Sequence, residues 1–292
     1  KIIYILGAAF LFYVGYYLIT SIGIFKKRKK VTNNNDDKKN FFAVIIAARN
    51  EENVIGKLID SLKKQSYPSE YFDIYVIVNN CTDNTAIEAK KAGAKVISCT
   101  EKVSTKGEVL KYTFDLFKDN NKIDAYAIFD ADNIVHHDFL AKMNDMINSG
   151  YSVAQGFRDT KNISDNWLTS SYAILYYFQS LFLNESRYNM GRSSFLNGTG
   201  FVIKKEVIDK HGFNPKTVTE DVEFTAMCAI NNEKIGFATD AITYDEQTNS
   251  FDVSWKQRKR WSFGTMECLR EYFPTLLKKG IKERNFECFD VG

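Results

Sequence analysis

The sequence predicts an α/β fold with a mixed, mainly parallel sheet that carries helices on both faces, preceded by a transmembrane helix. Short apolar runs rich in β-branched or aromatic residues predict buried strands at residues 41–48, 74–78, 95–98 and 125–129. Helix-like segments lie between them at residues 54–65, 85–92 and 106–118. Strands that alternate with helices form a parallel sheet, in which ligands bind beyond the carboxyl ends of the strands.

The start of the chain is strongly apolar. Residues 2–25 contain no charged side chain, and about 24 residues at about 1.5 Å each reach the ~30 Å of a hydrocarbon core. A basic cluster follows at once, formed by Lys26, Lys27, Arg28, Lys29 and Lys30. The positive-inside rule places this flank in the cytoplasm, and anionic headgroups would attract it. A cleaved signal peptide is disfavoured because its basic residues would precede the apolar run. We therefore expect residues 1–30 to anchor the protein in the cell membrane, with the next domain in the cytoplasm.

Three further segments follow this expected anchor. Residues 31–40 are polar and rich in Asn, which predicts a short linker. Residues 41–250 contain the alternating strands and helices and are expected to form the α/β domain. Residues 251–292 combine aromatic and basic residues at helical spacing, which predicts an amphipathic helical region on an anionic membrane surface. Pro274 is expected to interrupt that helical region.

The composition excludes some classes of partner. The chain has 292 residues and a net charge of only +3, from 39 basic and 36 acidic residues, so nothing predicts nucleic-acid binding. The five cysteines are odd in number and widely spaced, without a CxxC pair. This pattern favours reduced, cytosolic thiols over a disulfide framework or a zinc site.

An acidic triplet directly follows the predicted strand at residues 125–129. Asp130 and Asp132 flank an alanine there, so their carboxylates can converge on one cation. Carboxylate oxygens suit Mg²⁺ or Mn²⁺, which would neutralise the charge that builds on a diphosphate leaving group. An Asp-x-Asp triplet by itself is also common in surface turns, so both interpretations stay open at this point.

Two later motifs add candidate groups. Glu220 and Asp221 begin a predicted helix, where carboxylates most often act as capping groups. Asp221 is also a candidate general base, which would take the proton from an acceptor hydroxyl during glycosyl transfer with inversion. The run QRKRW at residues 257–261 is either a solvated helix face or a substrate contact. In the second case Arg260 would bind diphosphate oxygens, and a sugar would pack on Trp261.

Several motifs together resemble glycosyltransferase family 2, which has the GT-A fold. In chain order they are IIAARNEE, VNNCTDNT, a Lys106-Gly107 pair, FDADN, GRSSFLNGTG, TEDVEF and QRKRW. Within that family the chain is similar to the membrane-bound bacterial synthases of exopolysaccharides, cellulose, hyaluronan and poly-N-acetylglucosamine. The resemblance covers residues 41–261, and the joint spacing of the later motifs makes it more specific than any single motif.

The resemblance implies a role for residues at matching positions. It assigns catalysis to Asp221 and the metal to Asp130 and Asp132. It assigns nucleotide binding to Ala48, Arg49, Asn50, Glu51, Asn80, Asp83, Lys106 and Asp130. It assigns contacts with the acceptor and the diphosphate to Asn197, Gly198, Thr199, Glu220, Gln257, Arg260 and Trp261. Much of the family has an aspartate where this chain has Asn79 or Asn80, so the contact with the base is expected to differ in detail.

The function implied is that of an inverting, metal-dependent hexosyltransferase. It would move a sugar from a UDP-linked donor to a growing polysaccharide, with membrane lipid as a further partner. One alternative is the transfer of a single sugar to a lipid or lipid-linked acceptor. An alternative of another class is a catalytically inactive scaffold that binds nucleotide.

Overall fold

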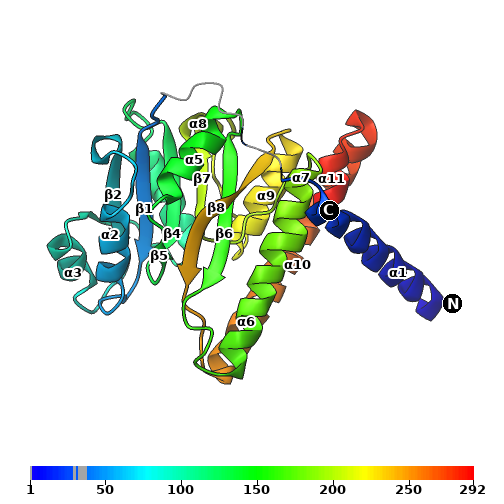
Figure 1. Cartoon of the computed structure of the whole chain (residues 1–292), viewed down its shortest axis with the longest axis horizontal. Coiled ribbons are helices and arrows are strands. Elements are labelled where there is room, and N and C mark those ends of the chain that lie inside the picture. Colours follow the sequence, from blue (N-terminus) through cyan, green and yellow to red (C-terminus); the bar gives the residue numbers. More distant parts are fainter. Residues whose placement is uncertain (1, 29–30, 32–37) are drawn as a thin grey trace.

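The computed structural model describes residues 2–28, 31 and 38–292, and Figure 1 shows their arrangement. Lys29, Lys30 and most of the predicted linker at residues 31–40 lie outside the described residues. Between residues 41 and 130, the strands and helices agree closely with those that the sequence predicts.

The centre of the domain is an eight-stranded sheet with the order β3-β2-β1-β4-β7-β6-β8-β5. Its strands are β1 (Phe42–Ala48), β2 (Phe72–Val78), β3 (Lys95–Ser98), β4 (Ala125–Asp130), β5 (Ile134–Val135), β6 (Val153–Thr160), β7 (Phe201–Lys204) and β8 (Ile235–Asp245). The first four strands are parallel, as predicted. β7 is antiparallel to both β4 and β6, while β8 is parallel to β6. The sheet is therefore mixed and mainly parallel.

Helices cover both faces of this sheet (Figure 1). They are α2 (Ile55–Lys63), α3 (Thr85–Lys91), α4 (Lys106–Leu116), α5 (Phe139–Asn148), α8 (Lys205–His211) and α9 (Glu220–Ile230), with a short 3₁₀ turn η2 (Ser69–Tyr71). Successive residues of β1 belong to different hydrophobic clusters: Val44 and Ile46 to one, Ala43 and Ile45 to the other. Because side chains alternate across a strand, β1 is buried on both faces.

A second group of helices lies beside the sheet. It comprises α6 (Trp167–Phe178), the π-helix η3 (Gln179–Glu185), α7 (Ser186–Asn189), α10 (Phe251–Glu283) and α11 (Phe286–Val291). α6 and α10 run side by side in Figure 1, and the hydroxyls of Tyr172 and Ser254 lie 2.7 Å apart between them.

α10 corrects one prediction, because it continues through Pro274 as a helix of 33 residues. A proline inside a helix removes one hydrogen bond and strains the preceding turn. Tertiary packing offsets that cost beyond the proline. Leu276 is buried, and Gly280 lies directly against the ring of Phe289 in α11. Packing of this kind supplies most helical stability in proteins.

The apolar start of the chain forms the helix α1 (Ile2–Ser21) and a 3₁₀ turn η1 (Ile22–Phe25). In the part of the chain that the structure describes, no helix combines the length and the apolarity needed to cross a membrane. The transmembrane helix expected in residues 1–30 stays a prediction. The end of α1 and the residues after it contact the domain: Ser186 donates to the carbonyl of Thr20, and Arg28 pairs with Glu185 at 2.7 Å.

Candidate active site

The acidic triplet lies at the carboxyl end of β4, next to the parallel strand β1. Asp130 is the last residue of β4, and its backbone N–H is 3.0 Å from Oγ1 of Thr199. Lys106, the first residue of α4, donates to a carboxylate oxygen of Asp130 and to the carbonyl of Gly198. This lysine therefore joins the acidic triplet to the segment NGTG.

The carboxylates near Asp132 concentrate negative charge. Burial raises the pKa of Asp132 to about 8, and the neighbouring carboxylates of Asp245, Asp130 and Glu51 act in the same direction. Oxygen donors crowded in this way are the ligands that hard divalent cations take, and such a cation would relieve their repulsion. The donor set of Asp130 and Asp132 therefore fits Mg²⁺ or Mn²⁺.

The predicted base comes to the same place from a distant part of the sequence. Glu220 and Asp221 are the first residues of α9. A Cβ placed on Gly198 would lie 3.4 Å from Oδ2 of Asp221, so this carboxylate borders the glycine. Burial raises the pKa of Asp221, while the amide of Val222 and the cations Lys106 and Arg158 oppose the shift.

Glu220 shares this environment. Burial raises the pKa of Glu220 to about 7, with Lys106 lowering it and the carboxylate of Asp221 raising it further. Burial lowers the pKa of Lys106, but the carboxylates of Asp130, Glu220 and Asp221 raise it above its ordinary value. The catalytic and metal roles of these residues stay predictions, but the structure brings Asp130, Lys106, Gly198 and Asp221 together.

The predicted nucleotide loops follow β1 and β2 and are joined to each other. Oδ1 of Asn50 accepts a hydrogen bond of 2.8 Å from the amide of Thr82. Asp83 accepts from the amides of Glu52 at 3.1 Å and Thr85 at 3.0 Å. Ala48 ends β1, Arg49 is exposed, and Asn80 donates to the carbonyl of Val103. The carboxylate of Asp83 is therefore engaged in holding the loops, and its predicted contact with the base stays untested.

The predicted acceptor segment is buried, unlike an ordinary surface turn. Thr199 is fully buried and Asn197 is 6% exposed. Within the described residues, both polar atoms of the Asn197 side-chain amide lack a hydrogen-bond partner. Buried amides without partners are rare, and a ligand that supplied them would relieve the cost. Gly198 and Gly200 have φ values of +86° and +62°, which side chains with a Cβ adopt only with strain.

The motif QRKRW lies on α10, and only some of its side chains are partly buried. Gln257 and Trp261 are partly buried, whereas Arg260 is exposed. The ring of Trp261 meets that of Tyr172 in α6 edge-on, with centroids 6.3 Å apart. One turn later, Gly264 packs against Thr219, immediately before Glu220. α10 thus contacts the residue that precedes Glu220, and the predicted diphosphate contact of Arg260 stays a prediction.

Two charged residues of this site were not predicted from the sequence. Arg158 in β6 and Asp245 at the end of β8 form a largely buried ion pair next to Asn197. An acidic residue at the end of the segment AITYD was the available signal, since carboxyl ends of strands gather at one edge of the sheet.

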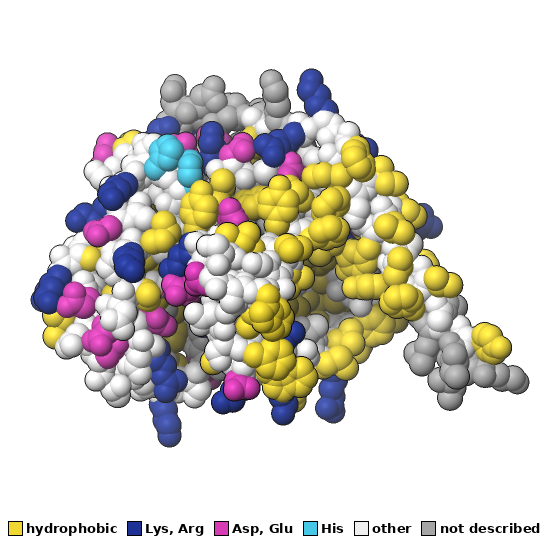
Figure 2. Space-filling model, turned by 60° about the horizontal axis from the view of Figure 1, so that its bottom comes forward, with side chains coloured by type: hydrophobic (Ala, Val, Ile, Leu, Met, Phe, Trp, Pro, Cys, Tyr) yellow, Lys and Arg dark blue, Asp and Glu magenta, His cyan; other side chains and the backbone are white. Residues whose placement is uncertain are grey.

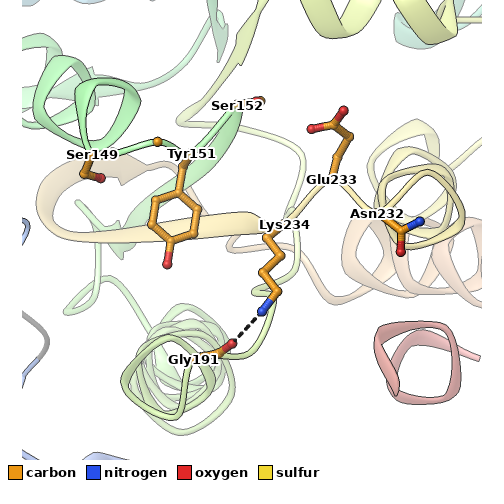
Figure 3. Close-up of a pocket in the computed structure, with 8 residues that line it drawn as sticks. Ser149, Tyr151, Ser152, Gly191, Asn232, Glu233 and Lys234 are labelled. Atoms are coloured by element: carbon orange, nitrogen blue, oxygen red, sulfur yellow. Dashed lines mark hydrogen bonds between the residues drawn. The ribbon is translucent and has the colours of Figure 1, made fainter. Parts of the chain in front are cut away.

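A polar hollow lies at the opposite end of the sheet. Figure 3 shows its lining, which includes Tyr151, Ser152 and Lys234 at the beginnings of β6 and β8. Its volume is about 450 Å³, and Lys234 donates to the carbonyl of Gly191 at 3.1 Å. This hollow is therefore separate from the acidic triplet at the carboxyl end of β4.

A mixed sheet of this topology, with an acidic triplet ending its central parallel strand, defines the class of GT-A glycosyltransferases. The chain belongs to a family described as glycosyltransferase like family 2, whose model matches residues 39–264. This result confirms the family and the fold that the motifs predicted. The finer resemblance to polysaccharide synthases stays a prediction.

Individual relatives share about a quarter of their aligned residues with this chain. The chain is 24% identical over 262 residues to "Probable glycosyltransferase YdaM" of Bacillus subtilis, covering 82% of this chain and 59% of the relative. It is 25% identical over 241 residues to a beta-monoglucosyldiacylglycerol synthase of Synechocystis, covering 77% of this chain and 48% of the relative. The chain thus spans between about half and three fifths of these proteins.

A solved structure shows the same fold. It is the mannosyltransferase PcManGT from Pyrobaculum calidifontis, in complex with GDP-Man and Mn²⁺. The TM-score is 0.71 at 16% identity, over 92% of this chain and 74% of that chain.

Proposed function

We propose that this chain is the catalytic part of an inverting, metal-dependent glycosyltransferase that moves one sugar from a UDP-linked donor to a lipid acceptor. One observation carries the chemistry: Lys106 donates to Asp130 and to the carbonyl of Gly198, and Gly198 borders Oδ2 of Asp221. The metal site is supported by the carboxylates around Asp132 and by the Mn²⁺ in the structurally similar mannosyltransferase.

In this proposal the residues divide the reaction between them. Asp221 takes the proton from the acceptor hydroxyl as its oxygen attacks the anomeric carbon. The new bond forms on the face opposite the bond to the diphosphate, which breaks as UDP leaves, so the configuration inverts. Lys106 stabilises the negative charge near Asp130, and a cation held by Asp130 and Asp132 would neutralise the leaving diphosphate. The buried amide of Asn197 offers hydrogen bonds to the acceptor.

The acceptor class is inferred from an exposed apolar surface beside the cleft. We call it the apolar face; its side chains are exposed on α6 and α10. They are Trp167, Ile174, Leu175, Tyr177, Phe178, Phe251, Val253, Trp255, Phe263, Met266, Leu269 and Phe273. Figure 2 shows hydrophobic side chains gathered over one side of the molecule, with most charged side chains on the other. Contiguous apolar surfaces of this kind mark protein or membrane interaction sites.

The chemistry of the apolar face favours lipid over protein. Tryptophan and tyrosine are enriched at membrane interfaces, and basic side chains beside them attract anionic headgroups. Arg258 lies 5.8 Å from the ring centroids of Phe251 and Trp255, so cationic and aromatic groups are adjacent here. The exposed Lys26 and Lys27 add charge near the end of α1. We propose that the apolar face lies on the cytoplasmic surface of the cell membrane.

Vesicle binding tests the membrane part of the proposal. Wild-type protein should sediment with phosphatidylglycerol vesicles, and Trp255→Ser combined with Phe263→Ser should weaken this binding. Ile87→Ser is the matched control, because Ile87 is an exposed apolar residue on α3, far from α10 in Figure 1. Equal binding by the double variant and the control would contradict the membrane proposal.

Product analysis tests the reaction. The protein is incubated with Mn²⁺, UDP-glucose or another UDP-sugar, and vesicles that contain diacylglycerol. We expect a lipid carrying one sugar, formed with inversion, and no product in excess chelator. Asp221→Asn should abolish transfer but keep nucleotide binding. Full activity in chelator would refute the metal role, and nucleotide binding without transfer to any acceptor would support the scaffold alternative.

Polysaccharide elongation is the second candidate. The motif QRKRW and the position of Trp261 beside the cleft favour it. Product size separates the two candidates: a ladder of growing glycan supports elongation, and a single product supports transfer to lipid.

A further inference from the structure

We propose that Arg158 is a positioning residue, which holds the acceptor segment Asn197–Gly198 against the base through its paired contacts with Asp245 and Tyr176. This inference rests on the proposed function and adds a specific role for a residue that no motif assigns. Arg158 belongs to β6, and its partners come from β8, α6 and the loop before β7.

The guanidinium of Arg158 uses both of its edges. Nε donates to Oδ2 of Asp245 at 3.0 Å, and Nη2 donates to the same oxygen. Nη1 donates to the backbone carbonyl of Asn197 at 2.8 Å. Only 12% of the Arg158 side chain and 5% of the Asp245 side chain are exposed. The fork is rigid and planar, so fixing one edge on Asp245 also fixes where the other edge points.

An aromatic ring fixes the plane of this guanidinium. The ring of Tyr176 lies with its centroid 3.9 Å from Cζ of Arg158, and the tyrosine is 5% exposed. Stacking of this kind stabilises a desolvated cation. Tyr176 is stacked in turn with Tyr172, with centroids 6.2 Å apart, and Tyr172 contacts Trp261 of α10. The cation is therefore held by the helix layer as well as by the sheet.

Two cations hold two successive carbonyls of the acceptor segment. Arg158 binds the carbonyl of Asn197, and Lys106 binds the carbonyl of Gly198 at 2.6 Å. Gly198 borders Oδ2 of Asp221, so a shift of these carbonyls changes the space between the segment and the base. Small displacements of reacting groups cost large factors in rate.

Asp245 links this arrangement to the acidic triplet. Its Oδ1 accepts from Nδ2 of Asn133 at 3.0 Å, and Asn133 also donates to Asp132 at 3.3 Å. Oδ2 of Asp245 accepts a further hydrogen bond of 2.8 Å from Gln247. Arg158 is thus placed relative to the metal-binding carboxylates, and the acceptor segment is placed relative to Arg158.

A buried ion pair could also serve stability alone, and buried pairs often contribute little to it. The two roles differ in which step they affect. A positioning role predicts slower transfer, with donor binding and donor hydrolysis unchanged. A purely structural role predicts that donor binding, donor hydrolysis and transfer all decline together with the melting temperature.

The test compares variants of the full chain with Mn²⁺, UDP-glucose and diacylglycerol vesicles. Arg158→Lys keeps the charge but cannot bind Asp245 and Asn197 together, and Tyr176→Leu removes the ring while keeping apolar volume. We expect each to lower kcat for transfer or raise the acceptor KM by about 10-fold or more. The donor KM and the rate of UDP-glucose hydrolysis without acceptor should stay within about 2-fold of wild type.

Arg192→Lys is the matched control. Cζ of Arg192 lies 3.7 Å from the ring centroid of Phe286. Arg192 is therefore also an arginine that stacks on an aromatic ring, but it lies away from the proposed site. It should leave the ratio of transfer to hydrolysis unchanged. Equal losses of transfer and hydrolysis in the Arg158 and Tyr176 variants, or no loss of either, would overturn the inference. A wild-type chain that transfers no sugar would overturn the proposed function and this inference with it.

Discussion

The two parts of the proposed site are held by different kinds of contact: the predicted nucleotide loops after β1 and β2 form the nucleotide side, and the predicted acceptor segment at residues 197–199 forms the acceptor side. On the nucleotide side, exposed side chains such as Asn50 cap backbone amides between the loops after β1 and β2. On the acceptor side, Arg158 and Lys106 bind successive carbonyls and are themselves paired with carboxylates. Removing a solvated cap leaves groups that water can satisfy, whereas removing a buried cation leaves charges unpaired. The acceptor side should therefore tolerate substitution far less than the nucleotide side.

Lys106→Met should have the largest effect and tests the acceptor side directly. It removes the cation that faces Asp130, Glu220 and Asp221, and it frees the carbonyl of Gly198. We expect transfer to fall by about 10²-fold, because one preorganised charge near the leaving group is lost. Steady-state kinetics with Mn²⁺ and UDP-sugar measure the rate of transfer in both proteins. A loss smaller than that caused by disrupting the nucleotide loops would show that the acceptor side tolerates substitution better than expected.

Gly198→Ala should have the next largest effect. The added Cβ would lie 3.4 Å from Oδ2 of Asp221, at a residue whose φ is +86°. The strain is of the order of 1 kcal/mol, and the segment would shift relative to the base. We expect about a 10-fold decrease in kcat with an unchanged donor KM. Gly150→Ala is a suitable control, because its φ is +101° and nothing lies within 4 Å of an added Cβ. Equal kinetic losses in both variants would contradict a local effect.

Asp83→Ala tests the nucleotide side, where a smaller effect is expected. Burial acts to raise the pKa of Asp83, but hydrogen bonds from Thr85 and Glu52 hold that pKa below its ordinary value. Loss of these contacts should loosen the loops and raise the donor KM a few-fold, with kcat little changed. Nucleotide titration and initial rates measure the two quantities. A large fall in kcat would show that the nucleotide loops also control the chemical step.

Glu108→Gln should have the smallest effect, since it changes only the start of α4. Thr105 and Glu108 form a capping box, and the amides of Ser104 and Thr105 lower the pKa of Glu108. The folded protein therefore gains stability above the ordinary pKa of glutamate and loses it as the pH falls through the lowered value. Because the group is solvated, we expect a loss of about 0.5 kcal/mol at neutral pH. Unfolding curves of the two proteins should converge once the pH falls below the lowered pKa of Glu108.

Much of the nucleotide side was predictable from local sequence. β1 (Phe42–Ala48) and β2 (Phe72–Val78) are short apolar runs, and polar residues follow each of them. Such patterns depend only on neighbours in the chain, so they indicate strands, loops and the acidic end of β4 without knowledge of the fold. The order of the motifs then identified the family, which the match over residues 39–264 confirms.

Other features depended on partners that are far apart in the sequence. Arg158 and Asp245 are separated by 87 positions, and neither lies in a motif that indicates the other. The continuation of α10 beyond Pro274 depends on Phe289 in another helix, and the packing of Thr20 depends on Ser186.

Local patterns along the chain specify the strands and helices up to residue 130, the family and the residue types available for chemistry. Which charges meet depends on packing, since burial and pairing arise only when β6, β8, α6 and the segment at residues 197–198 come together. The physical reason is that periodicity and composition are local properties, whereas a desolvated ion pair depends on the position of every element packed around it.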